Sequence, residues 1–190
     1  FNPLPFILGQ KGAAQCLSSK PEGKAKFLLI PRDPGVFSKE PPRIIEAPDG
    51  FVFHHLNAYE ENHTVIIDSI FYKDFPSIGP KENFLKINFD EIPEGKLKRC
   101  HIHLDKNKLE HEVLSNQCCE FGMVNPNLQG LSATFSWMAT AEKKFGNGPL
   151  QSIKKLNLKT KDSHYWSAAP RGFVSEPIMV PNQPSQNEDD

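Results

Sequence analysis

The chain has 190 residues, of which 38% are hydrophobic and 24% charged, with a formal net charge of −1 at pH 7. This composition is typical of one folded domain, or of a large part of one, and differs from that of a disordered tail. It lacks the strongly basic character of nucleic-acid-binding domains, so we expect no nucleic-acid partner. No apolar run approaches the roughly 18–20 residues of a spanning helix. A peripheral membrane contact stays open, because a few exposed apolar side chains suffice for it.

The sequence predicts antiparallel β-structure throughout. Short apolar segments with a period of two alternate with turn residues, and 17 prolines interrupt most windows that a helix needs. In chain order, the expected strands are Lys26–Pro31, Gly50–Glu60, Thr64–Tyr72, Lys96–Asp105, Leu109–Leu114, Ala133–Ala141, Ser152–Lys159, Ser163–Ala168 and the start of one more at Ile178–Val180. Residues 75–95 form a long loop, a kind of segment that is usually functional or covers a core. The pattern alone leaves sandwich, barrel and propeller open.

The four cysteines show neither metal-ligand spacing nor a dense disulfide pattern. We therefore expect free thiols and a reducing compartment. The first residue is not Met, no signal peptide pattern follows it, and the last residues show no sign of a natural terminus. We accordingly expect a chain truncated at both ends.

The segment FVFHHLNAYEE contains the histidine of greatest interest, His54. Alternate side chains of a strand share a face. One face is expected to carry His54 with Val52, Leu56 and Ala58, and the other Phe51, Phe53, His55 and Asn57. An imidazole in an apolar row needs a partner for each ring nitrogen, and a metal ion is one such partner. On the pattern alone, a core histidine bonded to backbone is favoured over a metal ligand.

Two glutamates stand in mainly apolar segments. Glu120 begins the run EFGMVNP, where a buried carboxylate is costly unless it is paired. It either accepts a hydrogen bond from a metal-ligating imidazole, which fixes the tautomer of that ring, or lies on the surface at the mouth of a loop. Glu176, in SEPIMVP, precedes a proline that favours extended backbone. It is a weaker candidate for the same bracing role.

A second histidine pair, His101 and His103, shares one face of an expected strand, and such a pair can bind a metal. That face also carries Arg99 and Asp105, while the opposite face is apolar: Cys100, Ile102 and Leu104. We therefore interpret the pair as part of a solvated face. No P-loop, dinucleotide-binding glycine pattern, nucleophile elbow or CxxC motif indicates hydrolytic or nucleotide chemistry.

Together these segments resemble the carotenoid cleavage oxygenase family. FVFHHLNAYEE resembles its Phe-His-x-x-Asn-Ala-x-Glu ligand motif, EFGMVNP its Glu-Phe-Pro-x-x-Asn-Pro segment, and SEPIMVP followed by EDD its Ser-Glu-Pro-Ile-Phe-Val-Pro segment and acidic turn. NPLPFILGQKGA and KFLLIPRD look like the stretch after its second ligand histidine. The resemblance covers essentially the whole chain. Gly122, Met179 and Asn182 depart from the usual Pro, Phe and Arg.

The resemblance implies a seven-bladed β-propeller, so we expect an all-β fold with several antiparallel blades of an incomplete ring. Residues 1–190 would be a fragment of one propeller domain. In this family four histidines hold Fe(II) on the axis, and three glutamates brace them. His54 matches the third ligand, Glu120 its brace, and Glu176 the brace of the fourth; His55 is not expected to be a ligand. We expect His54 Nδ1 within about 2.6–3.2 Å of a Glu120 oxygen, the range of a hydrogen bond.

The implied activity is that of a non-haem Fe(II) dioxygenase that cleaves a conjugated double bond of a carotenoid or apocarotenoid to carbonyl products. Its expected partners are that substrate and O2, and its expected location is the cytoplasm or a plastid, with peripheral membrane association left open. The other ligands would lie outside this sequence, so the fragment alone is expected to hold no iron and to be inactive. The alternatives are a non-catalytic propeller that binds partners and a non-cleaving isomerase of the same family.

Overall fold

The structure is a computed structural model. It describes residues 2–12, 16, 25–33, 35, 39, 41–48, 50–73, 75, 88–142, 147–182 and 187–189. Most of the predicted loop at residues 75–95 lies outside these ranges. Among the described residues, no helix is long and apolar enough to cross a membrane.

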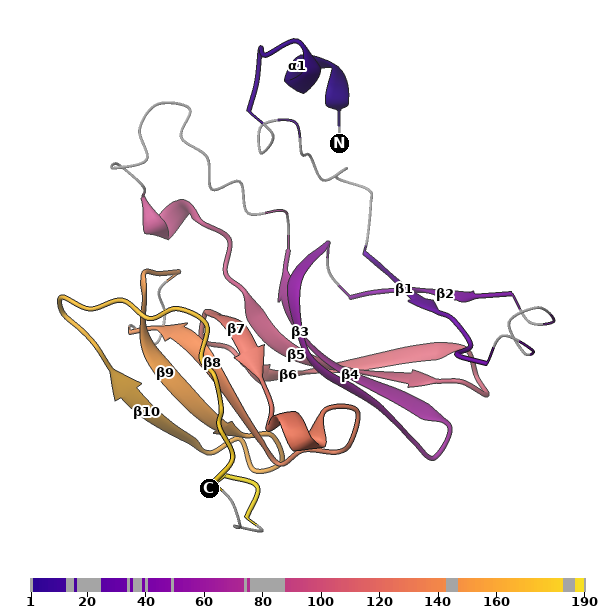
Figure 1. Ribbon diagram of the computed structural model, residues 1–190. Coiled ribbons are helices and arrows are strands. Elements are labelled where there is room, and N and C mark those ends of the chain that lie inside the picture. Colours follow the sequence, from indigo (N-terminus) through magenta and orange to yellow (C-terminus); the bar gives the residue numbers. More distant parts are fainter. Residues whose placement is uncertain are drawn as a thin grey trace.

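Three antiparallel sheets make up the fold (Figure 1). A two-stranded sheet pairs β1 (Lys26–Leu29) with β2 (Arg43–Glu46). The His54 sheet has the order β3-β4-β5-β6, with β3 (Phe51–Glu61), β4 (Thr64–Tyr72), β5 (Lys96–His103) and β6 (Lys108–Ser115). The Glu120 sheet has the order β10-β9-β8-β7, with β7 (Cys119–Met123), β8 (Phe135–Ala141), β9 (Leu150–Asn157) and β10 (Ser163–Ser167). Among the described residues there are also the short helices α1 (Pro3–Ile7), η3 (Phe89–Glu91) and η4 (Pro126–Leu128).

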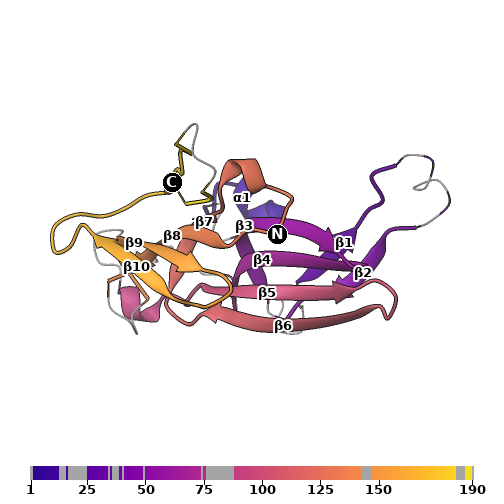
Figure 2. The same ribbon diagram turned by 90° about the horizontal axis from the view of Figure 1, so that it is seen from below.

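The four strands of each larger sheet follow one another in sequence, so each sheet is a simple meander (Figure 2). Side chains alternate between buried and more exposed positions along β9 and along β5 from Arg99 to His103, as the period-two pattern predicts. Two of the tight turns place Asn62 and Asn107 at φ 49° and 48°, a left-handed conformation that asparagine adopts more readily than most residues.

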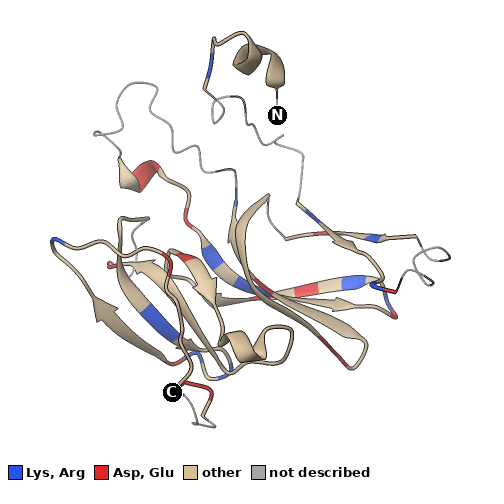
Figure 3. Cartoon of the chain, in the orientation of Figure 1, with Lys and Arg blue, Asp and Glu red and all other residues tan. Residues whose placement is uncertain are grey.

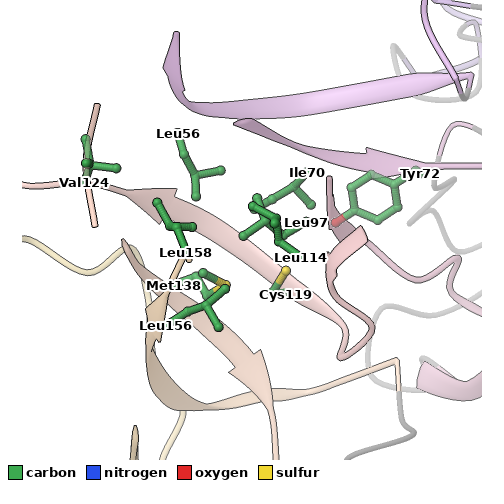
Figure 4. Packing of buried hydrophobic residues seen from close by; sticks show 11 residues of the cluster. Leu56, Ile70, Tyr72, Leu97, Leu114, Cys119, Val124, Met138, Leu156 and Leu158 are labelled. Atoms are coloured by element: carbon green, nitrogen blue, oxygen red, sulfur yellow. The ribbon is translucent and has the colours of Figure 1, made fainter. Parts of the chain in front are cut away.

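Apolar cores lie on both faces of the His54 sheet. The larger core fills the space against the Glu120 sheet (Figure 4) and includes Leu56, Ile70, Leu97, Met138 and Leu156. The smaller one packs Ile67, Phe71, Cys100 and Ile102 against Ile45 and Ala47 around β2. The His54 sheet is therefore covered on both faces, as a blade between two neighbouring blades would be.

Several predictions on secondary structure need correction. The sequence did not predict α1, β2 or β7, which are each only four or five residues long. Ile178–Val180 forms no strand: the segment is extended, and Met179 N donates to Met123 Sδ at 3.1 Å without a strand partner among the described residues. All four cysteines are free, as expected. Acidic and basic residues are interspersed along the strands (Figure 3), in keeping with the near-neutral charge.

Candidate metal centre

The two residues singled out from the sequence meet between the two larger sheets. His54 comes from β3 and Glu120 from β7, the first strand of each sheet. His54 Nδ1 lies 2.6 Å from Glu120 Oε2, which confirms the expected contact. The His54 side chain is 40% exposed and that of Glu120 only 11%. Glu120 therefore lies behind the imidazole ring, and the ring reaches toward open space.

The contact determines the tautomer of His54. An ionised carboxylate only accepts hydrogen bonds, so Nδ1 carries the proton and donates it to Glu120. The Nε2 atom is then the unprotonated nitrogen with a free lone pair. Within the described residues His54 Nε2 has no hydrogen-bond partner. This is the state in which an imidazole ligates a metal ion, with the carboxylate raising its basicity.

Two irregularities in β3 determine the directions in which the side chains around His54 point. The pairing with β4 slips between Val52 and His55 and again between His55 and Asn57. Each bulge reverses the direction in which the following side chains point. Val52 and Ala58 pair with Phe71 and Ile67 of the smaller core and so lie on the face toward β1. His54 lies within the first shift and points the other way, toward Glu120. The prediction that Val52 and Ala58 share the face of His54 is therefore wrong. Leu56 does belong to the core on the Glu120 side, and Phe51 packs against that core too.

His55 turns away from Glu120, as expected for a residue that is not a ligand. Its Nδ1 forms a 2.6 Å hydrogen bond with Ser69 Oγ. Partial burial of its ring, and then the neighbouring His54, lower the pKa of His55. The adjacent histidines thus have different surroundings, and only His54 combines a carboxylate brace with a free ring nitrogen.

The backbone of β7 is shaped around Glu120. Phe121 has φ 56°, a conformation that is rare for a bulky residue and concentrates at functional sites. This turn brings Phe121 N to donate to Glu120 Oε2 at 2.9 Å and sets the Phe121 ring 5.0 Å from the His54 ring. At Gly122 any Cβ would lie 2.7 Å from Leu56 Cδ1, so a larger residue would require Leu56 to shift.

An apolar pocket of about 410 Å³ opens beside His54. Its walls include Phe53, Tyr72 and Phe121, with Phe89, Ile92 and Pro149 farther round. The Phe53 and Tyr72 rings meet edge to face at 5.6 Å. The pKa of Tyr72 is raised, first by burial and then by Glu120, through its charge and a hydrogen bond. The Tyr72 hydroxyl therefore stays protonated. The pocket thus offers mainly apolar and aromatic walls next to His54.

Asn57 locks β3 just beyond His54, a role that the sequence did not reveal. Its amide is buried and donates to Leu131 O at 2.8 Å. Its Oδ1 accepts from Gly130 N at 2.9 Å and Ala58 N at 3.0 Å. The position of this asparagine in FVFHHLNAYEE was the only available signal, because Gly130 and Leu131 lie more than seventy residues away.

Glu176 lies apart from this pair. The residue is exposed, and no hydrogen bond or ion pair joins it to another described residue. It stands in the extended segment after β10, beside Pro177 and Ile178. Its role as a brace for a fourth histidine stays a prediction.

The second histidine pair behaves as a solvated face, as interpreted from the sequence. His101 Nε2 lies 3.9 Å from Glu112 Oε1, and His103 Nε2 lies 3.6 Å from Glu110 Oε2. Cys100 and Ile102, on the opposite face of β5, are fully buried. In the part of the chain that the structure describes, no group of three or more His, Cys, Asp or Glu side chains is placed to hold a metal ion.

Residues 1–190 match the model of the retinal pigment epithelial membrane protein family. The chain is 38% identical over 189 residues to the apocarotenoid-15,15'-oxygenase of Synechocystis sp., covering 100% of this chain and 38% of the relative. It is 26% identical over 187 residues to the carotenoid isomerooxygenase of Galleria mellonella, covering 93% of this chain and 35% of the relative. The chain thus spans less than two fifths of the length of these relatives.

The structure matches that of cobalt-substituted Synechocystis apocarotenoid oxygenase with a TM-score of 0.90 and 37% identity, over 100% of this chain and 38% of that one. The crystal structure of a chimera of that oxygenase with the retinal pigment epithelial protein matches with a TM-score of 0.89 at 36% identity, again over 100% of this chain and 38% of that one. The two open four-stranded sheets are thus blades of a partial seven-bladed β-propeller, as predicted. The chain belongs to the carotenoid cleavage oxygenase family, which includes the retinal pigment epithelial membrane protein.

Proposed function

We propose that the complete protein is a non-haem Fe(II) dioxygenase that cleaves a conjugated double bond of a carotenoid or apocarotenoid. The observation that carries the proposal is the 2.6 Å bond between His54 Nδ1 and Glu120 Oε2 at the edge of an apolar, aromatic pocket. One nitrogen of His54 is braced and the other is left free beside a space that suits a hydrocarbon chain. A metal ligand next to an apolar binding site is the arrangement that this chemistry needs.

His54 would hold the metal through Nε2, with Glu120 keeping the ring oriented. Imidazole is a suitable ligand for iron, and the Irving–Williams order gives such a site little intrinsic preference for Fe(II) over later metals. When bound, iron supplies the activation of dioxygen. The further ligands would come from parts of the protein outside this sequence, with Glu176 bracing one of them. One imidazole alone holds iron poorly, so we propose that residues 1–190 alone are inactive.

The pocket supports the substrate class. Phe53, Tyr72 and Phe121 present aromatic surfaces to a flat conjugated chain, and aromatic contacts favour such stacking. Tyr72 stays uncharged, so it adds no negative charge to the pocket wall that the conjugated substrate would contact. The protein would hold one double bond beside His54 and exclude water, and O2 added across that bond would yield two carbonyl products.

Two relatives support the reaction class and name its main rival. The Synechocystis relative is an apocarotenoid oxygenase, and the Galleria relative is a carotenoid isomerooxygenase. The second name makes isomerisation a specific alternative to cleavage alone. A third candidate function is that of a non-catalytic propeller that binds partners through its loops. The hydrogen bond between His54 and Glu120 argues against it, because such a propeller needs no oriented imidazole.

The test is a product assay on the full-length protein. Anaerobically purified protein would be loaded with Fe(II), mixed with an apocarotenoid in detergent and exposed to O2, and its products separated by chromatography and identified by mass spectrometry. We expect two carbonyl fragments, loss of product in His54→Ala and retention in His55→Ala. Isomerised substrate without fragments would identify the non-cleaving isomerase, and unchanged substrate with metal bound would overturn the enzyme assignment.

The location also belongs to the proposal. An apolar substrate partitions into membranes, so we propose a peripheral membrane contact of a cytoplasmic or plastid protein. Cell fractionation with a salt and carbonate wash distinguishes this from an integral or wholly soluble protein. Release of the protein by the wash is expected; retention would contradict peripheral binding, and absence from the membrane fraction would contradict contact.

A further inference from the structure

A buried lysine lies between the two larger sheets, away from His54. Lys154 on β9 is only 6% exposed, and lysine is almost never this buried unless its charge is paired. Its ammonium donates to Ser115 Oγ at 3.0 Å and lies 5.5 Å from the centre of the Tyr165 ring. No carboxylate of a described residue forms an ion pair with it. An ammonium has three N–H donors, so this contact set leaves hydrogen-bonding capacity and charge uncompensated.

A pocket of about 420 Å³ lies against this ammonium. It is bounded by the end of β6 on one sheet and by β9 and β10 on the other, and Lys154, Ser115 and Tyr165 all line it. It shares no lining residue with the apolar pocket beside His54. The uncompensated charge thus stands at the wall of a space large enough for a small molecule.

The polar groups around the ammonium are held in place by their own bonds. Gln117 Nε2 donates to Ala141 O at 2.7 Å, and the Tyr165 hydroxyl donates to Gln117 Oε1 at 3.0 Å. These bonds fix the wall on which Lys154 lies and use the acceptor oxygen of Gln117. Among the described residues, the Lys154 ammonium forms a hydrogen bond with Ser115 Oγ alone.

We propose that this pocket binds a small organic carboxylate, with Lys154 as its counter-charge. A carboxylate supplies the missing negative charge and the acceptor lone pairs that the buried ammonium lacks. The exposed Glu142 lines the same pocket, held by the hydroxyls of Ser152 and Ser167, and its charge disfavours a doubly charged anion such as phosphate. It also offers an acceptor to a donor group on the ligand.

Acetate is the probe that tests the site in the full-length protein. Its dissociation constant would be measured by titration at constant ionic strength, with chloride as the balancing anion and inorganic phosphate as a second probe. We expect saturable acetate binding in the millimolar range and weaker binding of phosphate. Lys154→Met keeps the length and apolar contacts of the side chain and should weaken acetate binding at least tenfold. Lys159→Met, the matched control at the exposed end of the same segment, should leave it unchanged.

Glu142→Gln gives an opposite prediction that does not depend on the stability of the lysine variant. Removing the negative charge of Glu142 should tighten acetate binding several-fold and phosphate binding more. Equal acetate binding in wild type, Lys154→Met and Glu142→Gln, or no saturable binding in the wild type, would overturn the proposal. A parallel loss in Lys159→Met would do the same, because it would show a general charge effect.

Discussion

The β5–β6 hairpin and the first strands of the two larger sheets illustrate opposite uses of the same secondary structure. Along β5, side chains alternate from Arg99 to His103, with Cys100 and Ile102 fully buried, and the pairing with β6 slips only near the start of the strand, between Leu97 and Lys98. Along β3 and β7, two register shifts in β3, one in β7 and the positive φ of Phe121 break the alternation where His54 and Glu120 meet. Regular pairing stabilises the hairpin, whereas irregular pairing positions side chains for binding. Substitutions in the first region should therefore change stability, and those in the second should change metal binding.

The largest expected effect is on the regular region, at the buried ion pair of Arg99 and Asp68. Arg99 Nε and Nη2 donate to the two oxygens of Asp68 at 2.8 Å, and Asp68 is 1% exposed. Arg99→Met leaves an unpaired buried carboxylate and should lower the free energy of unfolding by about 3–5 kcal/mol. Urea denaturation of the full-length protein measures it.

The control for Arg99→Met is Lys108→Met, in the exposed pair with Glu110 on the same hairpin. An exposed pair contributes less than about 1 kcal/mol. Metal affinity should stay unchanged in both variants once the folded fraction is taken into account. A large loss of metal affinity in Arg99→Met would remove the contrast between the two regions.

In the irregular region, Glu120→Ala should weaken metal binding about 10- to 100-fold, the usual cost of removing a carboxylate that orients a ligand imidazole. Competition with a chelator, followed by metal analysis, gives the affinity. The matched variant is Glu112→Ala, whose carboxylate contacts His101 and Lys161 on the solvated face and should leave the affinity unchanged. Equal affinities in wild type and Glu120→Ala would show that the contact at 2.6 Å has no bracing role.

Asn57→Ala bridges the two regions, because this residue is structural but follows His54 by three positions. The substitution leaves Gly130 N and Leu131 O without their partner and should cost about 1–3 kcal/mol of unfolding free energy. It should also speed the loss of metal, since β3 is less firmly held. Thermal unfolding and the rate of metal release to a chelator measure the two effects. Unchanged release with reduced stability would confine Asn57 to a structural role.

The smallest effect is expected at the contact between the sheets, where Lys161 Nζ lies 2.9 Å from Glu112 Oε2. The hydrogen bond from Lys161 lowers the pKa of Glu112 below its ordinary value. The stabilisation from this ion pair is therefore present above the pKa that Glu112 has in the unfolded chain. It is lost as the pH falls through the lower pKa that Glu112 has in the folded protein. Both side chains are exposed and screened, so Lys161→Met should cost less than about 1 kcal/mol at pH 7. The difference from wild type should vanish in acid, which unfolding at several pH values would show.

The sequence predicted what depends on periodicity and on local motifs. The long hairpins, the solvated face of His101 and His103, and the meeting of His54 with Glu120 followed from it. The sequence-based prediction failed where tertiary contacts determine the structure. Strand β2 is four residues long and depends on β1 as its partner. The bulges of β3 turn His54 away from the face of Val52 and Ala58 through pairing that no local pattern encodes. Nothing in the sequence indicated that Lys154 is buried, because a lysine in a half-exposed strand usually points to solvent.

The central claim, that His54 is a metal ligand braced by Glu120, is tested most directly by the iron content of His54→Ala and His55→Ala in the full-length protein. The two positions are adjacent on β3 and lose the same group, but only His54 contacts Glu120. After anaerobic loading with Fe(II) and desalting, we expect wild type and His55→Ala to retain about one iron per chain and His54→Ala to retain little. Full retention in His54→Ala, or equal loss in both variants, would contradict the account.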